Sequence, residues 1–253
     1  MKIFFLILLM LVVAVTVALW LWRHADHTED RAVMSKLAAL QPAAPDRFDY
    51  SLLERRPAPA QRYFRYTIKP DTPLCTVARI SMTGRFGMGN REAPDYLEMQ
   101  ATQMLAVPEG FIWKMSASRG ALRVSGSDTD KWTRFWLMGL IPVARMGGDP
   151  DHTRSAFGRY VAESVFWTPA ALLPGQGVKW ELVDVNTARV IVRHNAMEQA
   201  VDVVVAEDGR PIQVSFDRWS NANPEKVHRL QPFGGYLSEF REFDGFLLPT
   251  RVE

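Results

Sequence analysis

Cysteine is almost absent from the 253-residue sequence: Cys75 is the only one, so no disulfide can form within the chain and the redox compartment cannot be inferred. One thiol cannot build a thiolate zinc site, and the five histidines show no paired spacing on a helix or hairpin. Clustered basic residues are absent too, because the formal net charge is +2 and the arginines and lysines are scattered among acids. We therefore expect no metal, no cofactor and no nucleic acid as a partner.

The motifs of common enzyme classes are also missing. The sequence has no Gly-x-Ser-x-Gly elbow, and no histidine lies near Cys75 along the chain. Gly84, Gly87 and Gly89 have neither dinucleotide-loop nor P-loop spacing and indicate a bend between strands. Pairs of carboxylates that catalyse hydrolysis cannot be recognised before the fold is known. An enzyme therefore stays open as an alternative, while a protein without catalysis is favoured.

Charged residues are absent from residues 3–22, a long apolar run. At a rise of about 1.5 Å per residue, a helix over this run is about 30 Å long, which is the thickness of the hydrocarbon core of a membrane. Trp20 and Trp22 lie at its far end, where aromatic side chains favour the headgroup layer, and Arg23 follows. The run predicts a transmembrane anchor over residues 1–24. A cleaved secretion signal is the alternative, but its apolar core is usually shorter.

A short amino-terminal tail before the anchor and a long domain behind it are typical of an exported domain on an inner-membrane stalk. Lys2 on one side of the anchor competes with Arg23, Arg31 and Lys36 on the other, so charge does not set the orientation. Long domains cross the membrane largely regardless of charge. We predict a single-pass protein of the bacterial inner membrane with a periplasmic domain.

Three segments are predicted along the chain: the anchor at 1–24, a stalk and linker at 25–56, and an antiparallel β domain at 57–253. A short helix is expected at 31–41, ended by Pro42. A second helix is expected from Pro57 or Pro59 to about Tyr66, because proline suits the first turn of a helix. Since the chain stops directly after a strand of alternating residues, we expect a last strand to be missing or supplied by a protein partner at the C-terminal sheet edge.

Apolar residues recur at every second position through most of the domain, which indicates half-buried strands. The clearest hairpin joins residues 201–205 to 212–216 across Asp208-Gly209. One helix, at about 153–167, interrupts about ten strands. The predicted fold class is mainly β (α+β): an N-terminal transmembrane helix followed by a curved antiparallel sheet or half-barrel with a covering helix. The side chains expected to face inward against this helix are Trp113, Met115, Val203, Val205, Val214 and Phe216.

Candidate ligand-binding residues come from this helix and from the apolar face of the sheet. Arg159 and Glu163 are four residues apart and can form a surface ion pair, or they can lie at the mouth of an apolar cavity and orient a polar headgroup. A curved sheet can enclose more apolar surface than its own side chains fill, which creates a lipid pocket. No catalytic residue and no metal ligand is assigned. The candidate ligand-binding residues are Trp113, Met115, Trp136, Arg159, Tyr160, Glu163, Trp167 and Phe216.

Two groups of acidic residues have simple structural interpretations. Asp149, Asp151 and His152 could ligate a hard cation, but a Gly-Gly-Asp-Pro-Asp loop before a helix is more simply turn chemistry and N-capping. Asp128 and Asp130 are likewise interpreted as parts of a turn.

Six stretches carry a family resemblance: Arg62-Tyr63-Phe64-Arg65-Tyr66, Gly110-Phe111-Ile112-Trp113, Arg159-Tyr160-Val161-Ala162-Glu163, Trp167-Thr168-Pro169, Val178-Lys179-Trp180-Glu181 and Leu248-Pro249-Thr250-Arg251-Val252. Together they resemble an uncharacterised bacterial family of membrane-anchored proteins with a domain of unknown function, over about residues 57–253. The order of strands and helices is more loosely similar to the half-barrel of periplasmic lipoprotein carriers. In those proteins a curved antiparallel sheet and covering helices hold acyl chains, so the resemblance implies a similar fold.

Three functions are ranked. The favoured one is a membrane-tethered binding domain for a lipid or other apolar ligand, without catalysis. The second is a structural or assembly module at the inner membrane, with a protein partner at the C-terminal sheet edge. The third is a membrane-tethered enzyme of unknown reaction, for which the only candidates in the sequence are Arg159, Glu163 and the loop at 149–152.

Overall fold

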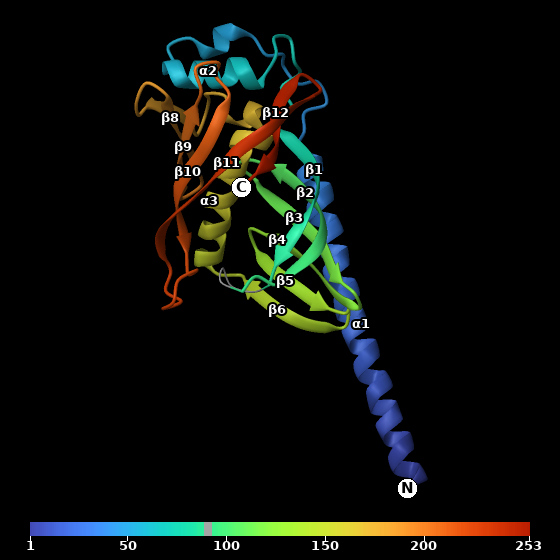
Figure 1. Ribbon diagram of the computed structural model, residues 1–253. Helices are drawn as coiled ribbons and strands as arrows, with labels where there is room; N and C mark the ends of the chain where they lie inside the picture. The colour runs from blue at the N-terminus through green and yellow to red at the C-terminus, as the bar shows by residue number, and fades with distance from the viewer. Residues whose placement is uncertain (89–92) are drawn as a thin grey trace.

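The computed structural model describes residues 1–88 and 93–253, which form two six-stranded antiparallel sheets one after the other along the chain (Figure 1). The first sheet consists of β1 (Val77–Gly87), β2 (Tyr96–Ala106), β3 (Gly110–Arg119), β4 (Leu122–Thr129), β5 (Trp132–Leu137) and β6 (Ile141–Gly147). The second consists of β7 (Val178–Leu182), β8 (Thr187–His194), β9 (Met197–Val205), β10 (Pro211–Ser220), β11 (Arg229–Phe243) and β12 (Phe246–Val252). The helices of the described residues are α1 (Lys2–Ala38), α2 (Ala58–Thr67) and α3 (Pro150–Trp167), with short 3-10 helices η1 (Tyr50–Leu53) and η2 (Pro169–Leu172).

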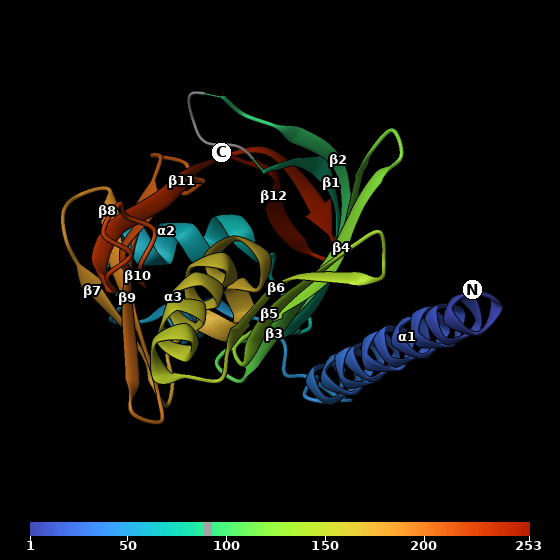
Figure 2. The same ribbon diagram turned by 90° about the horizontal axis from the view of Figure 1, so that it is seen from below.

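The mainly β, antiparallel architecture with a covering helix is confirmed, but it divides into two sheets rather than one. Within the described residues neither sheet closes into a barrel, since β1 and β6 are the edges of the first and β7 and β12 the edges of the second. The division falls at α3, which follows β6 and lies between the two sheets (Figure 2). The bend predicted at the glycines is wrong for Gly84 and Gly87, which lie inside β1, and Gly89 lies outside the described residues.

The turn between β5 and β6 was not predicted from the sequence. Met138 and Gly139 both have positive φ, 51° and 73°, and reverse the chain there. Gly139 also lies against Arg23 of α1, where any side chain would collide with the guanidinium. The pattern missed β6 because its first residues, from Ile141 to Ala144, are all apolar and show no period-two alternation.

The main core lies between α3 and the second sheet. Val190, Val203 and Val214 are almost fully buried and pack in one cluster with Val161 and Val165 of α3. Along β9 buried and partly exposed positions alternate, as expected for a sheet with one covered face. Five of the six side chains predicted to face inward against the helix do so: Val203, Val205, Val214, Phe216 and Trp113. Met115 also faces inward, but it lies in a separate apolar cluster of the first sheet that contains no residue of α3.

α2 closes one end of this core. It begins directly after Pro57, as the proline pattern predicted. Tyr63 and Phe64 pack their rings against Trp180 of β7, with centroids 5.4 and 5.3 Å away. The hydroxyl of Tyr63 donates to the backbone carbonyl of Val165 at 2.6 Å, which ties α2 to the end of α3.

α1 is one continuous helix of 37 residues, whereas a polar segment and a separate helix at 31–41 were predicted. Its apolar half is exposed, and by length and composition it is the one helix among the described residues that could span a membrane. The second half lies along the outer face of the first sheet (Figures 1 and 2). Residues 24–30 are polar and lack apolar periodicity, so the sequence pattern indicated no helix there.

Buried ion pairs hold α1 on the first sheet. Arg134 of β5 donates to the carboxylate of Asp30 at 2.7 Å, and Arg145 of β6 pairs with Asp26 at 2.5 Å. The indole of Trp136 also donates to Asp26, at 2.8 Å. Burial raises the pKa of Asp26, but the hydrogen bonds from Arg145 and Trp136 and the nearby arginine charges outweigh it and hold the pKa below its usual value. The helix is therefore docked through charges on strands more than a hundred residues away.

We expect Arg134→Ala to lower the free energy of unfolding by about 3–5 kcal/mol, because it removes the cation shared by the buried carboxylates of Asp30 and Asp26, at 2.7 and 3.1 Å, and leaves Asp30 with the more distant Lys114, at 3.4 Å. Arg229→Ala is the control, since Arg229 forms an exposed pair with Glu225 at 3.0 Å and such pairs are worth less than about 1 kcal/mol. Denaturant unfolding of both variants in the same detergent measures the difference. Equal losses would mean that the network does not hold α1.

Candidate functional site

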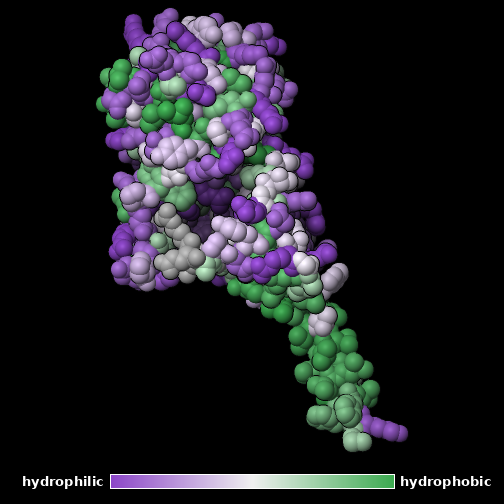
Figure 3. All heavy atoms as spheres, in the orientation of Figure 1, coloured by the Kyte–Doolittle hydropathy of each residue, from purple (hydrophilic) through white to green (hydrophobic). Residues whose placement is uncertain are grey.

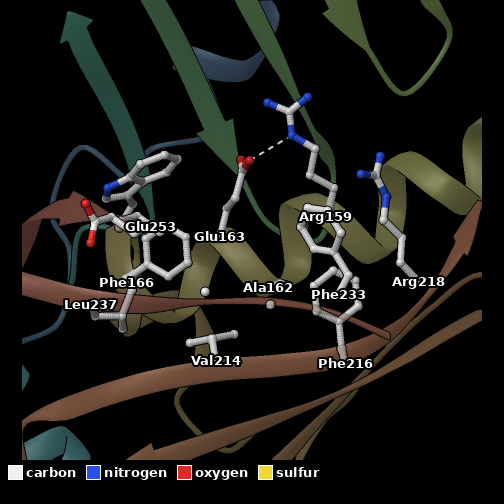
Figure 4. A pocket seen from close by; sticks show the side chains of 14 residues that line it. Arg159, Ala162, Glu163, Phe166, Val214, Phe216, Arg218, Phe233, Leu237 and Glu253 are labelled. Atoms are coloured by element: carbon white, nitrogen blue, oxygen red, sulfur yellow. Dashed lines mark hydrogen bonds and ion pairs between the residues drawn. The ribbon is translucent and has the colours of Figure 1, made fainter. Parts of the chain in front are cut away.

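A pocket of about 420 Å³ lies between α3 and strands β10, β11 and β12. Figure 4 shows the side chains of α3 and those of the strands converging on it. Ala162 on α3 and Gly235 on β11 lie at its walls, and their small size leaves the space open. The larger apolar side chains that line it are Phe166, Trp167, Val214, Phe216, Phe233, Leu237 and Val252.

A polar cluster forms one end of the pocket and joins α3 to the first sheet. Arg159 donates to Glu163 at 2.7 Å and to Asp128 of β4 at 2.6 Å. Glu163 also accepts a bond from the amide of Gln103 on β2, at 2.5 Å. Burial lowers the pKa of Arg159, but the two carboxylates outweigh it and hold the pKa above its usual value. Both acids are therefore committed to Arg159, and its ring contact with Phe111, 5.0 Å from the centroid, completes its environment.

Arg218 of β10 lies at the same end of the pocket in a different situation. Its Nε is buried without a hydrogen-bond acceptor, and it forms no ion pair with any residue in the described part of the chain. Its guanidinium lies over the ring of Phe233, 5.1 Å from the centroid. Burial, together with the positive charge of Arg159, lowers the pKa of Arg218 below its usual value. The pocket thus contains one cation that is neutralised and one that is not.

Four of the predicted ligand-binding residues meet at this pocket. Arg159, Glu163, Trp167 and Phe216 all line it, although they come from α3 and from β10. Trp113 lies next to them, with its ring 5.7 Å from the Arg159 guanidinium. The ion pair of Arg159 and Glu163 is therefore at the mouth of an apolar cavity and is not a surface pair.

The other three predicted residues lie elsewhere. Tyr160 is buried on another side of α3, where its hydroxyl donates to the backbone carbonyl of Pro108 at 3.1 Å. Met115 is buried in the apolar cluster on the inner face of the first sheet. Trp136 points to the opposite face, beneath α1, where it bonds to Asp26. These three side chains do not line the pocket between α3 and β10–β12.

Four polar residues in or beside the pocket were not predicted from the sequence: Arg218 and Glu253 line it, and Asp128 and Gln103 bond to Arg159 and Glu163. Asp128 was interpreted as part of a turn but lies inside β4, opposite Trp113 on the inner face. Arg218 shares the face of Phe216, two residues before it on β10, so the period of the strand could have indicated it. No signal marks Gln103, which is fully buried within an apolar stretch of β2.

The acidic loop before α3 caps the helix, as predicted. Asp149 is the N-cap residue, and its side chain accepts a bond from the backbone N–H of His152 at 2.8 Å. The ring of His152 contacts the backbone carbonyl of Thr129 at 3.0 Å. These contacts give the loop a role in starting α3, which carries Arg159 and Glu163.

Two antiparallel sheets, a helix between them and an apolar pocket with a charged end define the class of this domain. The chain belongs to a family described as "Family of unknown function (DUF6544)", whose sequence model matches residues 46–253. This confirms the predicted membership of an uncharacterised family, with a match that begins at residue 46. No curated protein and no solved structure matches the chain. The looser similarity to lipoprotein carriers therefore stays a prediction.

The two arginines of the pocket should respond in opposite ways to the same substitution. Arg159→Met is expected to lower the free energy of unfolding by about 3 kcal/mol, because it leaves two partly buried carboxylates without their cation. Arg218→Met is expected to leave the free energy of unfolding unchanged or to raise it by about 1 kcal/mol, because a partly buried charge without an ion-pair partner is replaced by an apolar chain. Denaturant midpoints of the ligand-free variants measure both effects. A loss for Arg218→Met as large as that for Arg159→Met would contradict this description of the pocket.

Proposed function

We propose that the protein is a membrane-tethered binding domain for a lipid or other apolar ligand, and that the ligand lies in the pocket between α3 and β10–β12. The observation that carries the proposal is the space itself. The pocket provides about 420 Å³ between largely apolar walls, which a ligand can reach from solvent. This volume is in the usual range of small-ligand sites. Each CH₂ group that a ligand buries there contributes about 0.8 kcal/mol to binding.

The proposal includes the cellular location of the domain. α1 spans the bacterial inner membrane with its apolar half, and the domain lies on the periplasmic side. The length and composition of α1 support a membrane span. The continuation of the same helix onto the first sheet supports a domain held close to the bilayer, where lipid ligands are available.

The state of the acidic groups supports binding rather than catalysis. A general acid or base has to be within reach of a ligand and free to exchange a proton. Asp128 and Glu163 are the acids of the polar cluster, and both are paired with Arg159 at less than 3 Å. Glu253, the acid that lines the other end of the pocket, is paired with Arg251. Paired in this way Asp128 and Glu163 serve to position Arg159 and leave the apolar walls as the main contact for a ligand.

Filling the pocket should abolish ligand binding without unfolding the protein. Val214 lines the pocket, whereas Ile212, on the same strand, is exposed, so Val214→Phe and Ile212→Phe form a matched pair. We expect acyl chains to co-purify with the wild type and with Ile212→Phe, and to be reduced at least tenfold in Val214→Phe. Native mass spectrometry of the detergent-extracted full chain measures the bound mass, and thermal unfolding checks the fold.

Absence of acyl chains from the wild type, even after exposure to lipid, would overturn the proposal. Equal retention by a folded Val214→Phe variant would place the ligand outside this pocket. Should Val214→Phe not fold, Ala162→Leu fills the same space from α3 and replaces it in the comparison.

A further inference from the structure

The two arginines at the end of the pocket differ in their partners, although Figure 4 shows them near each other. Arg159 is already matched by Asp128 and Glu163, at 2.6 and 2.7 Å. Arg218 has no acidic partner among the described residues, and its buried Nε donates to nothing. The pocket therefore ends at a positive group with unused hydrogen-bond donors.

We propose that the ligand is a single-chain amphiphile with an anionic oxygen headgroup, a carboxylate or a phosphate monoester, that pairs with Arg218. This inference rests on the proposed function and specifies the chemistry of its ligand. A guanidinium presents parallel N–H donors that match two oxygens of a carboxylate or phosphate. Such charge-assisted pairs are about twice as strong as neutral hydrogen bonds.

The shape of the pocket gives the direction of the chain. In Figure 4 the arginines lie at one end, with Val214 and Ala162 in the middle. Leu237 and Phe166 lie toward the other end, together with Glu253, whose carboxylate is paired with Arg251. A headgroup at Arg218 therefore leaves the alkyl chain to run between α3 and the strands toward Leu237. The chain is bound by apolar contact along this path, and the headgroup by charge at its end.

Other headgroups do not satisfy the polar end. A quaternary ammonium would be repelled by Arg218, and the nearby acids are already paired: Asp128 and Glu163 with Arg159, and Glu253 with Arg251. A hydroxyl could accept from Arg218 but would leave its charge uncompensated. The arrangement of charges thus selects an anion from among molecules with the same alkyl chain.

The test compares ligands that share one chain and differ in the headgroup. Hexadecanoate and hexadecyl phosphate each compete with hexadecanol for the full-length protein in a neutral maltoside detergent, and native mass spectrometry counts the bound species. We expect the wild type to prefer either anion by at least about tenfold, the effect of one hydrogen-bonded charge. Arg218→Gln should bring the preference close to one, and Arg218→Lys should give an intermediate value. Arg229→Gln, which removes an exposed arginine of β11, should behave as the wild type.

The outcomes separate this inference from the function on which it rests. If the wild type binds neither hexadecanol nor the anions, the proposed function is wrong. If it binds hexadecanol as well as the anions, or if folded Arg218→Gln keeps the preference, the role of Arg218 is wrong and the lipid pocket stands. The anion that competes better identifies the headgroup as a carboxylate or a phosphate.

A separate observation concerns the side of the domain from which α1 emerges. The end of the apolar run of α1 contacts the β5–β6 hairpin three times. Trp22 meets Trp136 edge to face at 5.6 Å, Arg145 lies over the ring of Trp22 at 4.6 Å, and Arg23 lies against Gly139. The hairpin is therefore level with the end of the apolar half of α1.

Between these contacts the hairpin exposes apolar side chains. Met138, Leu140, Ile141 and Val143 are between 41 and 53% exposed. In Figure 3 the apolar surface of the helix continues onto the lower edge of the domain. Single apolar residues on a surface need no explanation, but a contiguous set that extends an apolar helix is typical of a membrane contact.

We infer that the β5–β6 hairpin lies in the headgroup layer of the bilayer that α1 spans and forms a second contact with it. The inference depends on the membrane span proposed above and not on the ligand. The ion pairs of Arg134 and Arg145 fix the hairpin against α1, so its apolar side chains cannot turn away from the bilayer. Burial of such side chains in the interface removes apolar surface from water.

Environment-sensitive labels test this contact in the full chain, in vesicles of phosphatidylethanolamine and phosphatidylglycerol. One label is placed on Ile141→Cys in a Cys75→Ser background, and the control label is placed on the native Cys75. Cys75 is exposed and precedes β1, at the opposite end of the first sheet from the β5–β6 turn (Figure 1). We expect a blue-shifted emission that spin-labelled lipids quench at position 141 and not at position 75. Val143→Cys repeats the measurement at a second exposed site.

Equal emission and equal quenching at the two positions would overturn the membrane contact of the hairpin. Failure of α1 itself to enter the bilayer would be recognised separately, because the whole chain would then stay in the soluble fraction when the vesicles are floated.

Discussion

Arg159 connects three parts of the molecule, and the pocket depends on that connection. Its side chain extends from α3 to Asp128 on β4 of the first sheet, while Glu163 accepts a bond from Gln103 on β2 of the same sheet. The apolar side of α3 is meanwhile buried on the second sheet. One helix thus contacts both sheets, through charge on one side and through packing on the other. The space beside Ala162 cannot be closed by moving the layers together without breaking one of these two contacts.

The parts of the fold that follow from local signals could be predicted from the sequence. The hairpin across Asp208-Gly209, the start of α2 after Pro57 and the capped start of α3 each depend on a few neighbouring residues. The division into two sheets could not be predicted, because the sequence does not indicate that β6 and β7, on either side of α3, belong to different sheets. β6 was missed since an apolar edge strand has no alternation to reveal it.

The candidate site was predicted only in part, because some of its contacts depend on local spacing and others join residues far apart in the sequence. Helical spacing brings Arg159 and Glu163 together, but their other partners come from strands far away in the sequence. Trp136 was predicted as a candidate ligand-binding residue, but it lies on the outer face of β5, whereas its neighbour Phe135 lies on the inner face. The outer face of β5 is buried at this point because α1 lies over it, and the polar segment predicted there did not indicate a helix that packs on the sheet.

The unbroken course of α1 has a mechanical consequence. A domain on a flexible tether explores a sphere whose radius grows with the square root of the linker length. Here the helix passes from its apolar half to the first sheet without a break, and it is clamped there by Asp26 and Asp30. With α1 in a bilayer, the domain is held at a fixed distance from the membrane and in a fixed orientation. If the domain binds a ligand as proposed, any molecule that exchanges the ligand with it has to approach at that distance from the membrane and from that side, so the two molecules find each other by diffusion in two dimensions.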